Sequence, residues 1–497
     1  MNVVFIDPTP YIINYGLRVL AAHVASLGHT VTIIFVSPSD LSERRTGYPE
    51  ALHEALAKLV HGADIVGFSF VSNYVALAQD LSDRIRALGI PVAWGGIHAM
   101  TKPEECLEHA DMVCLGEGEE AMTGLLERMA DGQDITDAPN FMFKRDGRII
   151  RNEVLPLVTD LDRYPFPLLD LGHLFIREDD TIVPLSEERY KSMVPAGAAY
   201  NGLPEGTYYQ YMTMASRGCP HACAYCCNRV FKELYQGKGP LLRLRSPENV
   251  VRELEAARER YPFFNFINIF DDDFLARPLE DIRVFAQLYR ERINVPFKCN
   301  CSPTSVSEAK IQALVDAGLV SLEMGLQTAS PRVNREVYKR KVSNKSFMDA
   351  ANIICRFPRI IPYYDVILDN PFESAQDTLE TIRFIGRIPV PFRLSWFSLT
   401  FYPGTELHRR ALEQGFLHDE IVEVYEKKNN AFNPERDPYL KYLITIAPGT
   451  SQRGWLPRFM FFNVFATLFA VRVFNNRLLH GVPRGLYALL KRCLGKG

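Results

Sequence analysis

The sequence predicts an α/β protein in which a doubly wound, Rossmann-like domain precedes a partial βα barrel and a helical C-terminal segment. Apolar strands alternate with amphipathic helices in two stretches, residues 1–135 and residues 208–420. In the second stretch a strand and a helix recur about every 30 residues, the repeat of a βα barrel. Residues 136–207 are less regular and contain several prolines, which indicates a connector with some strand content at residues 141–154, and residues 421–497 form the helical region.

The elements of both stretches follow from hydrophobic periodicity. Apolar residues at helical spacing lead up to Gly28, which suits a helix C-cap. Continuous apolar strands between amphipathic helices indicate a parallel sheet, which binds ligands at the carboxyl ends of its strands. The strands are predicted at residues 3–6, 31–36, 65–70, 92–94, 112–115, 266–270, 297–301, 320–324, 361–368 and 394–399, and two of the helices at residues 247–260 and 307–317.

Composition narrows the class of protein. Hydrophobic residues make up 47% of the chain and charged residues 23%, as in an ordinary folded protein. The formal net charge of −3 gives no attraction to nucleic acid, so no nucleic-acid partner is predicted. The N-terminus begins with a strand instead of a basic and apolar signal peptide, and cytoplasmic residence is therefore expected.

Ten cysteines are present, and four of them lie within nine residues. A disulfide scaffold would spread its cysteines evenly over a short secreted chain, so this clustering favours a reducing compartment and a metal site. The spacing of Cys219, Cys223 and Cys226 is C-x3-C-x2-C. Thiolates are the usual ligands of a [4Fe–4S] cluster, and three of them leave the fourth iron open to a small molecule.

A zinc site is the alternative interpretation of these cysteines, with Cys227 or His221 as a further ligand. Structural zinc sites usually combine two separated ligand pairs. The remaining close pair, Cys299 and Cys301, lies within one predicted strand about 70 residues further on. The spacing therefore favours the cluster.

The cysteine loop resembles that of the radical S-adenosylmethionine (SAM) superfamily, in which SAM chelates the open iron and an electron from the cluster cleaves it to a 5′-deoxyadenosyl radical. Fragments similar to the family's strand-end elements follow in order at residues 271–273, 323–328, 369–371 and 402–405. Each fragment alone also fits a solvated loop or a helix cap, and their order behind the cysteine loop is what favours a site. The resemblance implies that SAM contacts Tyr225, Asp271, Asp273, Glu323, Gly325 and Gln327.

The first domain lacks the dinucleotide fingerprint G-x-G-x-x-G after its first strand. Residues 95–98 and 116–119 resemble instead the cobalamin-binding domain that precedes many radical SAM barrels, although tight turns without a ligand would look alike. The D-x-H-x-x-G motif of many cobalamin proteins is absent, so no protein histidine is expected to bind the cobalt, and His23 and His98 stand in the wrong context. The residues predicted to contact cobalamin are Ser69, Gly95, Gly96, Gly116 and Glu117.

The C-terminal region is basic and apolar. After Asp437 there are nine Lys and Arg residues and no acidic ones. The apolar run at residues 459–471 is shorter than the roughly 20 residues of a membrane span. Two interpretations stay open, an amphipathic helix on a membrane surface and a cap over the barrel mouth. Both suit an apolar substrate such as a lipid, an isoprenoid or a tetrapyrrole.

The resemblance implies a C-methyltransferase that uses a [4Fe–4S] cluster, SAM and cobalamin to methylate an unactivated carbon, with a reductant such as flavodoxin or ferredoxin. A radical SAM cyclase, or an enzyme that rearranges a carbon skeleton, fits the same motifs. Two non-catalytic alternatives are a corrinoid or redox sensor and a zinc-containing interaction protein.

Overall fold

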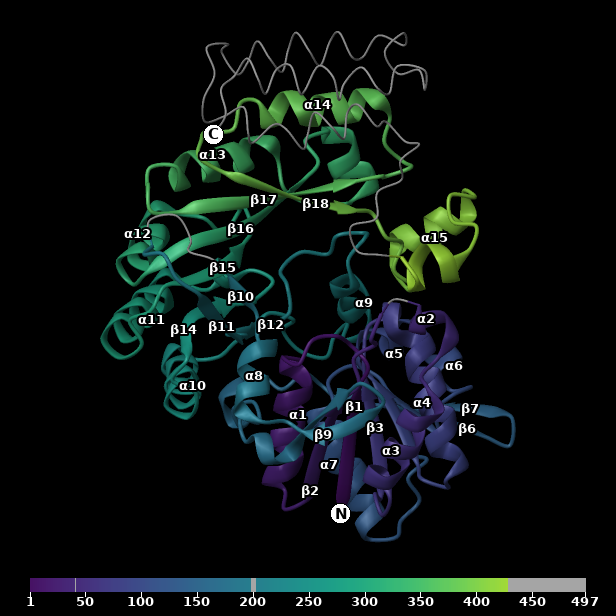
Figure 1. Ribbon diagram of the computed structural model, residues 1–497. Coiled ribbons are helices and arrows are strands. Elements are labelled where there is room, and N and C mark those ends of the chain that lie inside the picture. Colours follow the sequence, from purple (N-terminus) through teal and green to yellow (C-terminus); the bar gives the residue numbers. More distant parts are fainter. Residues whose placement is uncertain (41, 198–202, 428–497) are drawn as a thin grey trace. The chain divides into compact units, whose positions relative to one another are not determined.

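The structure is a computed structural model, and it describes residues 1–40, 42–197 and 203–427 (Figure 1). These residues fall into two compact units. The first unit takes in the described residues up to 197, together with residues 206–271 and 400–427, and the second unit takes in residues 272–399. The predicted helices after residue 427 lie outside the described residues.

A nine-stranded sheet forms the centre of the first unit, in the order β7-β6-β5-β4-β3-β1-β2-β8-β9. The five strands predicted for the first domain, β1 to β5, lie parallel in its middle, as continuous burial of their apolar residues requires. The strands are β1 (Asn2–Asp7), β2 (Thr30–Phe35), β3 (Ile65–Ser69), β4 (Val92–Gly95), β5 (Met112–Cys114), β6 (Phe141–Arg145), β7 (Arg148–Arg151), β8 (Leu174–Glu178) and β9 (Thr181–Pro184).

Helices cover both faces of this sheet, which confirms the doubly wound prediction. One pair of helices in contact is α1 and α7, and another is α3 and α4 (Figure 1). From β1 the chain adds β2 on one side of the sheet, and it then adds β3, β4 and β5 on the other side. The carboxyl ends of β1 and β3 therefore form the switch point at which such sheets bind ligands. The helices are α1 (Tyr15–Ser26), α2 (Glu43–Thr46), α3 (Glu50–Val60), α4 (Val75–Ala87), α5 (Gly96–Thr101), α6 (Pro103–Cys106), α7 (Glu119–Ala130) and α8 (Glu187–Met193).

The predicted connector, residues 136–207, has the strand content expected at residues 141–154 and a second hairpin that was not predicted. It contributes two antiparallel hairpins, β6–β7 and β8–β9, to the two edges of the nine-stranded sheet. The physical reason is the apolar run Phe141–Phe143, which is buried against β5, and the alternation of buried Leu174 and Ile176 in β8. Pro156, Pro165 and Pro167 lie between the two hairpins, and Pro184 ends the edge strand β9, where proline is tolerated.

The remaining elements of the first unit surround the cysteine loop. Strands β11 and β14 are parallel, as expected for the start of a βα barrel, and β12 pairs with β13 in a short antiparallel ribbon. The elements are β10 (Ala196–Gly197), β11 (Tyr208–Thr213), β12 (Ser216–Arg217), α9 (Cys227–Leu234), β13 (Arg243–Leu244), α10 (Pro247–Arg260), β14 (Phe264–Ile269), α15 (Glu406–Glu413) and the π-helical turn η6 (Ile421–Tyr425).

The second unit consists of four parallel strands with their connecting helices. Apolar side chains such as Leu322, Met324 and Tyr364 are buried, whereas alternate residues of the same strands are less buried and polar. The unit thus has the strand–helix repeat predicted for a partial barrel. Its elements are α11 (Leu279–Arg292), β15 (Phe297–Cys301), α12 (Glu308–Asp316), β16 (Leu319–Gln327), α13 (Asn344–Ile354), β17 (Ile361–Leu368), α14 (Ala375–Ile385) and β18 (Arg393–Ser398).

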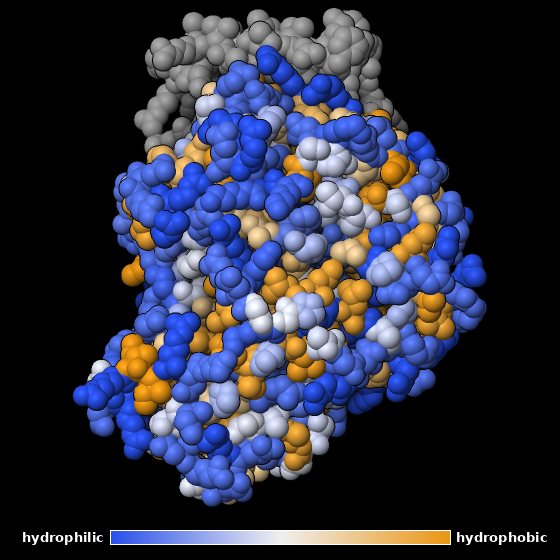
Figure 2. Space-filling model, turned by 180° about the vertical axis from the view of Figure 1, so that it is seen from behind, coloured by the Kyte–Doolittle hydropathy of each residue, from blue (hydrophilic) through white to orange (hydrophobic). Residues whose placement is uncertain are grey.

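The surface of the molecule is mostly hydrophilic on the side seen in Figure 2, where hydrophobic residues appear in separate groups. Among the described residues, every helix is too short or too polar to cross a membrane.

Candidate functional site

The cysteine loop lies between β12 and α9 in the first unit. Cys219 and Cys226 are half-buried and Cys223 is buried. The N–H of Cys226 donates to the carbonyl oxygen of Cys223 at 3.1 Å, which closes a turn inside the motif. Three thiols on one short loop can bind three of the four irons of a [4Fe–4S] cluster. Within the described parts of the chain, no three His, Cys, Asp or Glu side chains are placed to bind one metal ion together. An iron–sulfur cluster does not need such convergence, because each thiolate binds a different iron atom of the cluster.

Two arginines bind the cysteine loop to the N-terminal domain. Arg217, two residues before the first cysteine, pairs with Glu119 at an N–O distance of 2.5 Å, and Arg243 pairs with Glu117 at 2.5 Å. Burial alone would raise the pKa of Glu119, but the guanidinium of Arg217 outweighs it and holds the pKa below its usual value. A third contact comes from Tyr235 after α9, whose hydroxyl accepts from the backbone N–H of Glu117 at 2.8 Å.

Gly116 and Glu117 have contacts within the protein, and their contact with cobalamin stays a prediction. Gly116 has a φ of +83°, and a Cβ atom there would overlap the hydroxyl of Tyr235. The Glu117 carboxylate is taken up by Arg243. These two residues join the N-terminal domain to the segment that carries the cysteines. The two arginines were not predicted as site residues, because their partners lie 98 and 126 residues away in the chain.

The SAM contact of Asp271 likewise stays a prediction, and the structure shows which protein groups bind this carboxylate. This carboxylate is fully buried and accepts hydrogen bonds from the N–H of Ala215 at 2.6 Å and from the hydroxyl of Ser216 at 2.5 Å. Asp271 thus fixes the chain just before the cysteine loop. Asp273 belongs to the second unit, where it accepts from the hydroxyl of Ser305 at 2.7 Å.

Three of the residues predicted to contact cobalamin come together at the carboxyl ends of β3 and β4. Ser69 and Gly95 end these strands, and their register pairs them directly. Gly96 has a φ of +87°, and a Cβ atom would lie 3.1 Å from the hydroxyl oxygen of Ser69 and from the backbone of Phe70. Glycine is therefore needed at position 96. Because glycine has no side chain, a cofactor could approach the backbone at this edge of the sheet. This small-residue edge fits the predicted group.

The two histidines singled out in this domain have protein contacts. Nδ1 of His98 lies 3.0 Å from the hydroxyl of Ser72, and Nε2 of His23 lies 2.9 Å from that of Thr123. Burial lowers the pKa of His98 to about 4, so its ring is neutral at physiological pH. The expectation that no histidine binds the cobalt stays a prediction.

In the second unit, β16 presents Glu323, Gly325 and Gln327 on one face, because side chains alternate along a strand. The register places Asp365 of β17 opposite Gly325. Burial, together with the Glu323 carboxylate, raises the pKa of Asp365 to about 8. Asp365 was not predicted as a site residue, although an acidic residue within an apolar strand is a signal that could have been used.

Backbone contacts hold the end of β16 in place. The Arg340 guanidinium donates to the carbonyl oxygens of Gly325 at 2.7 Å and Leu326 at 2.9 Å. Gln327 adopts a φ of +65°, unusual for a residue with a side chain. Its Oε1 atom is buried and has no hydrogen-bond partner among the residues that the structure describes. A buried acceptor of this kind fits a ligand with N–H or O–H groups.

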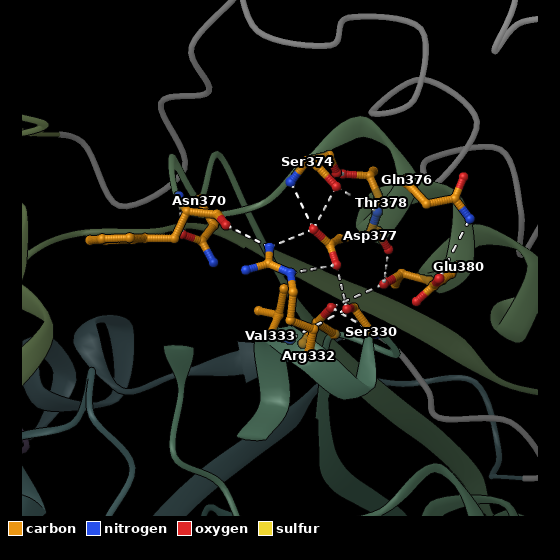
Figure 3. A network of polar contacts seen from close by, with 12 residues as sticks. Ser330, Arg332, Val333, Asn370, Ser374, Gln376, Asp377, Thr378 and Glu380 are labelled. Carbon is orange, nitrogen blue, oxygen red and sulfur yellow. Dashed lines mark hydrogen bonds and ion pairs between the residues drawn. The ribbon is translucent and has the colours of Figure 1, made fainter. Parts of the chain in front are cut away.

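A polar network fixes the loops that follow β16 and β17 (Figure 3). Asp377 in the first turn of α14 accepts from the Arg332 guanidinium at 2.6 Å and from the Ser330 hydroxyl at 2.5 Å. It also forms a capping box with Ser374, the N-cap of α14. The network thereby orders the strand ends beside the predicted SAM residues of this unit. Tyr225, the predicted adenine contact, is half-buried in the cysteine loop of the first unit.

Family models match both domains. The model described as the B12 binding domain matches residues 1–126, and the model of the radical SAM superfamily matches residues 214–385. The chain is 23% identical over 81% of its length to an uncharacterized methyltransferase of Pyrococcus horikoshii, covering 79% of that protein. It is 22% identical over 74% of its length to the bacteriochlorophyllide d C-8(2)-methyltransferase of Chlorobaculum tepidum, covering 71% of that protein.

A solved structure has the same fold. The radical SAM methyltransferase TsrM of Kitasatospora setae matches 83% of this chain and 76% of its own with a TM-score of 0.62 and 17% identity. The B12-binding domain thus precedes the radical SAM domain in the chain, and the cysteine loop lies within the residues that the radical SAM model matches. The chain belongs to the cobalamin-binding branch of the radical SAM superfamily.

Proposed function

We propose that this cobalamin-dependent, methyltransferase-like radical SAM enzyme transfers a methyl group to an unactivated carbon of an apolar substrate. The observation that carries the proposal is the attachment of the cysteine loop to the B12-binding domain through Arg217–Glu119 and Arg243–Glu117. A chain that used the two cofactors separately would gain nothing from burying two ion pairs between them, because such pairs are costly to desolvate.

Each cofactor has residues of this chain that would hold it. Cys219, Cys223 and Cys226 would bind the cluster, and Ser69, Gly95 and Gly96 would line the cobalamin edge. When bound, the cluster and SAM supply a carbon-centred radical, and cobalamin supplies the methyl group. The protein's part is to bind, to orient and to exclude water, and no acid–base pair is needed for hydrogen abstraction by a radical.

The polar face of β16 and β17 would receive SAM. Glu323 and Gln327 offer oxygen acceptors to the amino and ribose hydroxyl groups of SAM, and Asp273 is a further candidate. Tyr225 in the cysteine loop would contact the adenine. Gln327 Oε1, buried and without a partner among the described residues, is the acceptor that most needs a donor of this kind.

The substrate class is supported by one relative and by the basic and apolar composition of the C-terminal region, residues 421–497. The named substrate of the Chlorobaculum relative is a tetrapyrrole with a large apolar ring system. Tetrapyrroles, isoprenoids and lipids share extended apolar carbon skeletons. The reductant would be a flavodoxin or ferredoxin, since the cluster must receive one electron for each cleavage of SAM.

The test is anaerobic reconstitution with iron, sulfide and hydroxocobalamin. The wild-type chain should bind about four irons and one cobalamin and, once reduced, should form 5′-deoxyadenosine from SAM. Replacing Cys219, Cys223 and Cys226 together by alanine should abolish the cluster spectrum, whereas Cys227→Ala is the matched control and should keep it. An unchanged cluster in the triple variant would refute the assignment.

The product distinguishes methylation from ring formation. A tetrapyrrole such as a chlorophyllide, a polyprenyl phosphate and a fatty acid would each be incubated with the reduced enzyme and SAM. A gain of one CH2 with formation of S-adenosylhomocysteine supports methyl transfer, and a product that lacks this gain indicates a cyclase or a rearrangement. Bound cofactors without 5′-deoxyadenosine would indicate a sensor.

A further inference from the structure

Residues 400–427, here called the bridging segment, follow the last barrel strand in sequence but belong to the first compact unit. They contain α15 and the π-helical turn η6. Within that unit the segment contacts two regions, the cysteine loop and the edge of the B12-binding sheet, that are far apart in the chain.

The first contact is with the cysteine loop. The N–H of Leu407, in the first turn of α15, donates to the carbonyl oxygen of Ala224 at 2.9 Å. Ala224 lies between the second and third cysteines of the motif. Glu406 next to it pairs with Arg229 of α9 at 2.9 Å. The N–H groups of a first helical turn have no acceptor within their own helix, and here one of them finds its acceptor inside the loop that binds the cluster.

The second contact is with the residues that follow β3 and β4. Glu420 pairs with Lys102 at 3.1 Å, just after α5, and the side-chain amide of Asn73 donates to the carbonyl oxygen of Val424 at 3.0 Å. The ring of Tyr425 packs edge-on against the buried His98, with the ring centroids 5.7 Å apart. These residues adjoin the edge formed by Ser69, Gly95 and Gly96.

One ion pair joins the two halves of the bridging segment. Nε2 of His408 in α15 lies 3.1 Å from Oε1 of Glu420, the same carboxylate that binds Lys102. The His408 side chain is 7% exposed and that of Glu420 is 25% exposed, so the pair is largely shielded from water. A continuous set of contacts therefore leads from Ala224 in the cysteine loop, through α15 and Glu420, to Lys102 at the B12-binding edge.

We propose that the bridging segment sets the separation of the two cofactors, with Glu420 as its main positioning residue. This inference rests on the proposed function, since it assumes that the cysteine loop holds a cluster and the β3–β4 edge holds cobalamin. Catalysis between bound groups depends steeply on their placement, and a shift of about 1 Å can cost about 100-fold in rate. A second link beside the two arginine pairs would narrow the range of positions that the loop can adopt.

Pulsed electron paramagnetic resonance on the reconstituted full chain tests this directly. The reduced cluster and cob(II)alamin each carry an unpaired electron, so the distribution of distances between them can be measured without substrate. In Glu420→Gln, which removes the carboxylate that contacts both Lys102 and His408, the width of this distribution should at least double. Glu413→Gln is the matched control, because Glu413 is exposed on α15 and, among the described residues, forms its ion pair with Arg409 of the same helix.

Iron and cobalt content are measured on the same samples. If the wild type binds no cobalamin or no cluster, the proposed function itself fails. If Glu420→Gln keeps both cofactors and the wild-type width, the proposal is wrong although the function can stand. Should Glu420→Gln lose a cofactor, Lys102→Gln, which leaves the His408–Glu420 pair in place, decides the question by the same measurement.

Discussion

Replacing Arg217 by methionine should loosen the cysteine loop from the B12-binding domain. Methionine keeps much of the apolar length of the side chain but removes the guanidinium that pairs with Glu119. The Glu119 side chain is 5% exposed and that of Arg217 is 22% exposed, so the substitution leaves a nearly buried carboxylate without its partner. Loss of one member of a buried pair costs about 3–5 kcal/mol.

Two smaller effects act in opposite directions. The guanidinium lies 5.3 Å from the centre of the Tyr164 ring, and losing this cation–π contact adds roughly 0.5–1 kcal/mol. Glu119 lies in the first turn of α7, where the helix dipole stabilises a carboxylate by roughly 0.3–1 kcal/mol. These effects nearly cancel, so the expected cost stays at about 3–5 kcal/mol.

Amide hydrogen exchange measures this cost locally, which suits a chain with more than one compact unit. At about 1.36 kcal/mol for each factor of ten, exchange in peptides covering residues 119–130 and 216–226 should speed up by about 10²–10⁴-fold. Arg145→Met, which breaks an exposed pair with Asp134, should leave these peptides unchanged. A change below tenfold in the Arg217 variant would refute the reasoning.

Three further predictions concern other residues of the two units. Gly116→Ala should lower stability by about 2–4 kcal/mol, since it adds a methyl group against a packed tyrosine at a positive φ, and a downward shift of the melting temperature would show this. Because the folded pKa of Asp365 is raised to about 8, the stability that its protonated form contributes should be lost as pH rises from about 4 to 8, and melting curves of Asp365→Asn should lack this slope. Asp377→Asn should lower the free energy of unfolding, measured in urea, by about 2–4 kcal/mol. Because hydrogen bonds from Arg332 hold the pKa of Asp377 below its usual value, the wild type should lose this advantage in stability as the pH falls below about 4. An unchanged melting temperature in Gly116→Ala would contradict the first prediction, and an unchanged pH slope in Asp365→Asn would contradict the second. An unchanged urea midpoint in Asp377→Asn would contradict the third.

Local signals allowed much of the fold to be predicted. The helix predicted at residues 247–260 agrees with α10, because Ser246 caps its N-terminus at 3.1 Å from the N–H of Asn249 and Pro247 occupies its first turn. The strand predicted at residues 361–368 agrees with β17 for a similar reason, since its β-branched and aromatic residues are bounded by proline and asparagine.

The edge hairpins were harder to predict from the sequence. Strand β7 has four residues, three of them exposed, and β9 has no buried residue at all. Such strands lack the alternation that marks a half-buried strand, because they form by hydrogen bonding to an existing edge. Their extended conformation depends on pairing with the edge of the sheet, which consists of residues elsewhere in the chain.

Some residues of the candidate site can be predicted from their neighbours in the sequence, and others depend on partners far away in the chain. The spacing of Cys219, Cys223 and Cys226 is local, and it sufficed to predict the cluster loop. The partners of Glu117 and Asp271 are not local, and both carboxylates are bound to backbone or arginine groups around that loop. Three consecutive aspartates cannot reveal from sequence which carboxylate faces a ligand and which stabilises the chain.

Asp365 shows that the sequence nevertheless contains a further signal for the site. Residues 361–368 alternate along a strand, so Asp365 must lie on the face opposite to Tyr364 and Val366, which are buried. A carboxyl group on a strand between two apolar neighbours carries a desolvation cost, because burial disfavours its charged form. Carboxyl groups with strongly raised pKa values are frequent at functional sites, and Asp365 lies beside a second carboxylate, Glu323. The alternation of a predicted strand, combined with the cost of a buried charge, therefore makes this face of β17 a candidate site that the amino-acid sequence alone could have indicated.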